Sequence, residues 1–152
     1  MALFTSIHGK RFGLGERGNL VGNQIAITQP CVDATITVSA EGATTANTRD
    51  IVVQLLDADG NDINYVETVE LIMYLDAAQA AFVVTGGTTG LTIGAAGDGA
   101  VLDVVAKKYF LAMSEADGDL DLDWLDTGTE AAYLGVRLPN GRVIISDALT
   151  NT

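Results

Sequence analysis

The chain has few of the residues on which enzymes and small secreted domains depend. It contains a single histidine, His8, and a single cysteine, Cys31, in 152 residues. One cysteine cannot form a disulfide within the chain or build a zinc site on cysteines, so packing must stabilise the fold. With the histidine in the first ten residues, the rest of the chain has no histidine base for a nucleophile. Acidic residues are plentiful, but no spacing singles out an acid and base pair. We therefore expect no enzymatic activity, no cofactor and no metal ion.

Positive charge is also scarce. Eight Lys and Arg residues stand against twenty Asp and Glu, which gives a net charge of −12 and a pI near 4.1. Such a surface repels phosphate backbones, which argues against nucleic-acid binding. No apolar run is long enough to span a membrane, and the opening residues lack the apolar core of a signal peptide. We expect a protein made in the cytoplasm, and its positive mean hydropathy of +0.29 suggests a surface buried against a partner.

Residues 1–30 differ from the rest. Their charged residues are Lys10, Arg11, Glu16 and Arg17, a net charge of +2, so residues 31–152 carry −12 − 2 = −14. Glycines interrupt any helix there, while short apolar pieces remain. We expect an extended N-terminal arm over residues 1–30 that docks on a neighbouring subunit. The alternative is an irregular segment that folds back or stays disordered.

The remaining residues, 31–152, read as one β domain that begins after Pro30. Alternating or β-branched apolar runs predict nine short strands. These lie over residues 34–39, 51–56, 66–75, 91–93, 101–105, 109–113, 117–125, 131–138 and 142–146. The continuous apolar run 51–56 predicts a central strand covered on both faces. The alanine-rich stretch 76–81, with Asp76 as N-cap, predicts one helical turn.

The last hairpin has the clearest turn chemistry. Pro139 sets φ for the second position of a type I turn, and Gly141 takes the left-handed position that closes a bulged hairpin. In the strand before it, Leu134, Val136 and Leu138 alternate with polar or small residues. This pattern predicts a strand with one apolar face.

Two groups of acidic residues invite a metal-binding interpretation. The first, Asp57 to Asp62, has its glycine in the fourth position of the loop and Thr68 in the twelfth, whereas an EF-hand needs glycine sixth and glutamate twelfth. It therefore predicts a plain turn. In the second, Asp119, Asp121 and Asp123 share a strand face at intervals of about 6.5 to 7 Å, too far apart for one ion to bind all three. These three predict a solvated face opposite Leu120, Leu122 and Trp124.

Nine short strands with frequent turn signals predict an all-β fold, an immunoglobulin-like antiparallel β-sandwich preceded by the extended arm. The chain also resembles a family in four stretches. These are residues 1–14 (MALFTSIHGKRFGL), 54–60 (QLLDADG), 114–120 (SEADGDL) and 133–142 (YLGVRLPNGR). They resemble the small immunoglobulin-like virion proteins of tailed bacteriophages, many of which are head decoration or cement proteins.

The resemblance implies a structural protein of the virion that stabilises the outer surface of the capsid. Its partners would be the major capsid protein and neighbouring copies of itself, and a homotrimer would suit a local threefold site. Packaged DNA would repel the acidic body, which favours the outer surface. The arm residues that we expect to carry the contact are Phe4, Ile7, Arg11, Phe12 and Leu14.

Two alternatives stay open. The first is a tail or head–tail virion protein of the same fold. The second is a host-surface module that binds glycans or acts as a calcium-dependent adhesin. The second requires exposed aromatic residues around an acidic loop, and the chain has only nine aromatic residues, one Trp, four Tyr and four Phe.

Overall fold

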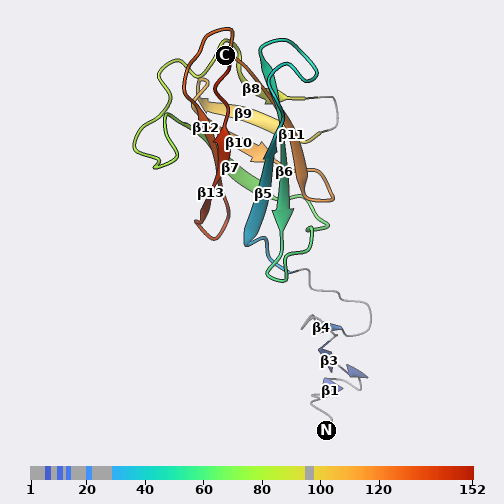
Figure 1. Ribbon diagram of the computed structural model, residues 1–152. Helices are drawn as coiled ribbons and strands as arrows, with labels where there is room; N and C mark the ends of the chain where they lie inside the picture. Colours follow the sequence, from blue (N-terminus) through green and yellow to red (C-terminus); the bar gives the residue numbers. More distant parts are fainter. Residues whose placement is uncertain (1–5, 8–9, 12, 15–19, 22–28, 95–97) are drawn as a thin grey trace. The chain divides into compact units, whose positions relative to one another are not determined.

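The computed structural model describes residues 29–94 and 98–152, together with the backbone of four short strands nearer the N-terminus. Contacts within the chain divide it into two units, Met1–Pro30 and Cys31–Thr152. In the first unit, β1 (Ser6–Ile7) pairs with β2 (Lys10–Arg11), and β3 (Gly13–Leu14) pairs with β4 (Leu20–Val21) (Figure 1). Both pairs are antiparallel.

The second unit is an antiparallel β-sandwich, which confirms the predicted fold class (Figure 1). One sheet has four strands in the order β5-β6-β11-β8, and the other has five in the order β13-β12-β7-β10-β9. The four-stranded sheet comprises β5 (Asp33–Val38), β6 (Thr48–Leu56), β11 (Asp119–Leu125) and β8 (Gly90–Ile93). The five-stranded sheet comprises β13 (Val143–Ala148), β12 (Tyr133–Arg137), β7 (Thr68–Tyr74), β10 (Tyr109–Met113) and β9 (Ala100–Val105).

The strand order within each sheet can be compared with that of an immunoglobulin domain, although the order along the chain differs. The order β5-β6-β11-β8 matches the A-B-E-D sheet, and β13-β12-β7 matches G-F-C. Strands β10 and β9 extend the second sheet, as C′ and C″ do in variable-type domains. Here, however, the chain forms β8, in the D position, before β9 and β10 rather than after them.

Alternating side chains build the core between the two sheets. Leu120, Leu122 and Trp124 of β11 are fully buried, as their spacing predicts. Leu134 and Val136 of β12, in the five-stranded sheet, are also buried and belong to the same core. Because β11 buries every second residue, the two-residue period of its sequence fixes which face of the strand points inward.

The prediction that the run 51–56 is covered on both faces is wrong. Ile51, Val53 and Leu55 are completely buried, but Val52, between them, is 41% exposed. β6 is a central strand, lying between β5 and β11. A sandwich has only two layers, so the outer face of the four-stranded sheet meets solvent at Val52 even though β6 is central.

The predicted helical turn at 76–81 is also wrong, because the chain reverses there in a tight turn. The N–H of Gln79 donates to the carbonyl of Asp76 (3.1 Å), and the N–H of Ala80 donates to the Asp76 carboxylate (3.2 Å). Asp76 thus caps a turn, as expected of an N-cap residue. Gln79 has a φ of 62°, in the left-handed region, which stops a helix from continuing. The described residues contain no helix.

The final hairpin turns as predicted. Gly141 has a φ of 85°, and its N–H donates to the carbonyl of Leu138 (2.8 Å). The side chain of Asn140 accepts a hydrogen bond from the N–H of Arg142 (2.9 Å). Local turn chemistry was therefore enough to place this reversal.

Candidate functional site

The residues expected to bind a partner lie in the first unit. Phe4 and Phe12 fall outside the described residues. Ile7, Arg11 and Leu14 lie in β1, β2 and β3, for which the structure describes the backbone only. Their role in binding stays a prediction.

Cys31 is buried, as a small core residue would be. Burial, together with the nearby charge of Glu67, raises the pKa of its thiol to about 11. A thiol with so high a pKa is almost entirely protonated at neutral pH, and the thiolate is the nucleophilic form. Cys31 is therefore a packing residue.

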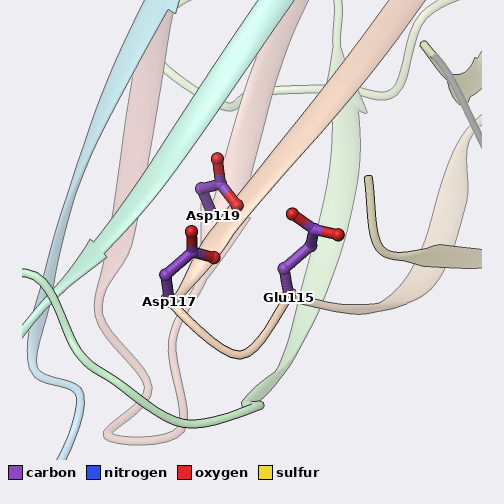
Figure 2. A group of neighbouring side chains, drawn as sticks. All are labelled: Glu115, Asp117 and Asp119. Carbon is purple, nitrogen blue, oxygen red and sulfur yellow. The ribbon is translucent and has the colours of Figure 1, made fainter. Parts of the chain in front are cut away.

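A cluster of three carboxylates lies where the chain enters β11. Glu115, Asp117 and Asp119 each bring one oxygen within 4.8 Å of the others (Figure 2). A tight turn assembles them: the N–H of Glu115 donates to the carbonyl of Asp119 (2.8 Å), and the N–H of Gly118 donates to the carbonyl of Glu115 (3.1 Å). Gly118 has a φ of 86°, which favours glycine at this position.

Asp119 is the residue most affected by this arrangement. Burial, and then hydrogen bonding and charge from Asp117, raise its pKa to about 6. The nearby charges of Asp121 and Glu115 add to the effect. The Oδ1 atom of Asp119 is buried and has no hydrogen-bond partner in the described part of the chain. The cluster therefore favours sharing a proton, and its oxygens are the type of ligand that hard cations prefer.

Sequence reasoning missed this cluster because it compared only residues on one strand face. The spacing of Asp119, Asp121 and Asp123 along β11 does keep those three apart. The turn before β11 instead folds Glu115 and Asp117 back towards Asp119 (Figure 2). The signal in the sequence was the Glu-x-Asp-Gly-Asp pattern at 115–119, in which Gly118 permits the reversal.

The other aspartates of β11 lie on an acidic outer face rather than a freely solvated one. Asp123 is directly opposite Asp50 of β6, and with Asp98 and Asp121 they line a groove of about 230 Å³. Burial, and then the nearby charge of Asp98, raise the pKa of Asp121. Burial, and then the nearby charge of Asp50, raise the pKa of Asp123. Like charges placed opposite one another across strands are destabilising, so this face carries an electrostatic cost.

The glycine-rich loop 85–90 forms an anion-binding cradle, and a carboxylate of the same chain occupies it. Glu130 accepts hydrogen bonds from the N–H groups of Thr85 (2.7 Å), Gly86 (2.9 Å) and Gly87 (3.1 Å). Burial alone would raise the pKa of Glu130, but a hydrogen bond from the Thr85 hydroxyl, together with those from the three N–H groups, outweighs it and lowers the pKa to about 2. Lys107 joins the same loop through a hydrogen bond from Nζ to the carbonyl of Thr88 (2.7 Å). Hydrogen bonds from other parts of the same chain therefore hold the loop in place.

A further surface feature is an apolar groove. A groove of about 220 Å³ lies on the five-stranded sheet, lined by residues of β9 and β10 and by Thr68 of β7. Leu102 is 65% exposed, Met113 is 49% exposed and Leu111 is 42% exposed. Leu102 lies directly opposite Leu111, and Ala100 lies opposite Met113, so these side chains share one face. An apolar patch of this kind often marks an interaction surface.

Across the part of the chain that the structure describes, no helix is long and apolar enough to cross a membrane. No family model, no curated protein and no solved structure matches the chain.

Proposed function

We propose that this protein is a structural component of a tailed bacteriophage that decorates the outer surface of the capsid and stabilises it. It binds the major capsid protein through the arm, residues 1–30. The body, residues 31–152, provides a rigid sandwich that covers the joint between capsid subunits. No chemical step is required for this role.

The observation that carries the proposal is the division of charge between the two units of the chain. The unit Met1–Pro30 has a net charge of +2 and contains several short apolar pieces, whereas residues 31–152 have a net charge of −14. A basic, apolar segment is suited to contact another protein, and the acidic body would be repelled by packaged DNA. The resemblance of residues 1–14 and 133–142 to phage virion proteins supports the same role.

The test is binding of the purified protein to undecorated capsids of a phage that encodes it. Co-sedimentation and the temperature at which the shells rupture are measured together. Stoichiometric binding that raises the rupture temperature is expected. Deletion of residues 1–20 is expected to abolish binding while the melting temperature of the sandwich stays unchanged.

A shortened protein that still binds shells as tightly would refute the role of the arm. Immunogold labelling of intact particles then separates the head from the tail. Gold on the tail or at the head–tail joint would replace capsid decoration with the tail alternative.

A further inference from the structure

We propose that the free edge of β9, with the apolar groove beside it, binds an extended strand of the capsid protein. The bound strand would be apolar at alternate positions and would carry a lysine or arginine beside Asp103. This inference rests on the proposed function, and it gives the sandwich a contact with the shell that is separate from the arm.

β9 is the last strand of the five-stranded sheet, and among the described residues it pairs only with β10. Its other side therefore presents backbone N–H and C=O groups in the pattern that a further strand would satisfy. Strand addition of this kind gains affinity from main-chain hydrogen bonds and specificity from the alternating side chains.

β9 is mostly apolar and mostly exposed. Its sequence is Ala-Val-Leu-Asp-Val-Val, and five of its six residues are exposed, all except Val101. Free edge strands of proteins that stay alone are usually short, charged or covered. Apart from the one charge of Asp103, β9 exposes Leu102, Val104 and Val105, so it is suited to burial against a partner.

The charge on β9 indicates which partner fits. Asp103 is the only charged residue of β9, and it is exposed. It lies directly opposite Phe110, which is fully buried, so Asp103 is on the inward side of the strand at the edge of the sheet. A basic residue on an added strand would pair with this carboxylate.

The same residue disfavours a second copy as the occupant. Two β9 strands can pair symmetrically and antiparallel with their inward-facing side chains on the same side of the joined sheet. In the registers that pair most of the strand, the two Asp103 residues then lie opposite one another or on the next diagonal. Their separation is then within about 8 Å. Each body also carries −14, so the two copies repel one another as well.

The experiment uses the full chain and undecorated shells, with two variants and two matched controls. Leu102→Gln removes the apolar anchor, and Val84→Gln is its control because Val84 is similarly exposed in a loop. Asp103→Lys reverses the edge charge, and Asp147→Lys is its control on β13, the opposite edge of the same sheet. Melting temperatures establish that all four variants are folded.

Leu102→Gln is expected to weaken shell binding about tenfold, the loss expected when one half-exposed leucine can no longer be buried. Asp103→Lys is expected to weaken it several-fold at low salt and less at high salt, because salt screens the charge contact. Both controls are expected to bind as the unmodified protein does.

Three results would overturn the inference. If Leu102→Gln and Asp103→Lys bind like the unmodified protein, the edge is not a contact, although binding through the arm stands. If the chain alone sediments as a dimer that Leu102→Gln dissociates, a second copy occupies the edge. If the unmodified protein does not bind shells at all, the proposed function fails together with the inference.

Discussion

Replacing Asp119 with asparagine is expected to stabilise the protein at neutral pH. The carboxylate is held close to Asp117 and Glu115, and its Oδ1 has no partner in the described part of the chain. Asparagine keeps the shape of the side chain, removes its charge and offers an N–H to the carboxylate of Asp117. The change thus imitates the protonated form of Asp119 that the surroundings already favour.

The magnitude follows from the pKa of Asp119, which rises from 3.8 to about 6. Each unit of difference between folded and unfolded states is worth about 1.4 kcal/mol, so the limit is about 3 kcal/mol. Asp119 is partly exposed, and solvent screening reduces the expected gain to about 1–2 kcal/mol. For a domain of this size that gain raises the melting temperature by about 4–8 °C.

The dependence on pH identifies the mechanism. Between pH 3.8 and about 6 the folded protein holds a proton on Asp119 that the unfolded chain has released, so stability falls as the pH rises through this window. Asparagine does not titrate, so the variant does not lose stability in this pH window. The advantage of Asp119→Asn should therefore be absent near pH 4 and complete above pH 7.

The assay is urea unfolding of both proteins at several pH values between 4 and 8, with a chelator present so that no cation neutralises the cluster. Asp147→Asn, on the exposed part of β13, is the control and should change stability little at any pH. An equal gain at pH 4 and pH 8, or a loss of stability at pH 8, would refute the electrostatic explanation.

Two further predictions concern the loops. Glu130→Gln is expected to lower the free energy of unfolding by about 1–3 kcal/mol at pH 7, because charged hydrogen bonds to Thr85, Gly86 and Gly87 are lost. Since the pKa of Glu130 is lowered from 4.5 to about 2, its contribution should disappear as the pH falls through that range, and acid titration of the melting temperature checks this. Gly118→Ala is expected to cost about 2–4 kcal/mol, because φ is 86° and an added Cβ would lie 2.3 Å from Cγ1 of Ile63. Gly60→Ala, with a φ of 79° but nothing within 4 Å, should cost only about 1 kcal/mol, and equal losses in the two variants would contradict the steric argument.

Much of the fold was predictable from local patterns. The alternation in β11 identified Leu120, Leu122 and Trp124 as core residues, and the turn at 139–141 was placed from its residues alone. Strand period and turn chemistry depend on neighbours a few residues away, so the sequence expresses them directly. The exposed side of β6 was mispredicted because the number of layers that cover a strand depends on the surrounding fold. The turn at 76–81 was mispredicted because the positive φ of Gln79 also depends on the surrounding fold.

The sequence by itself determined a β-rich body, its inward faces, its turns and the opposite charges of residues 1–30 and 31–152. Only the tertiary structure decided which distant groups meet. Glu130 accepts a hydrogen bond from Gly86, forty-four residues away in the sequence. Asp123 lies opposite Asp50 on the neighbouring strand. The order of the strands also left β9 as an edge and its apolar side chains uncovered. These features arise from long-range pairing, whose register and partners are set by the packing of the whole sandwich rather than by any local stretch.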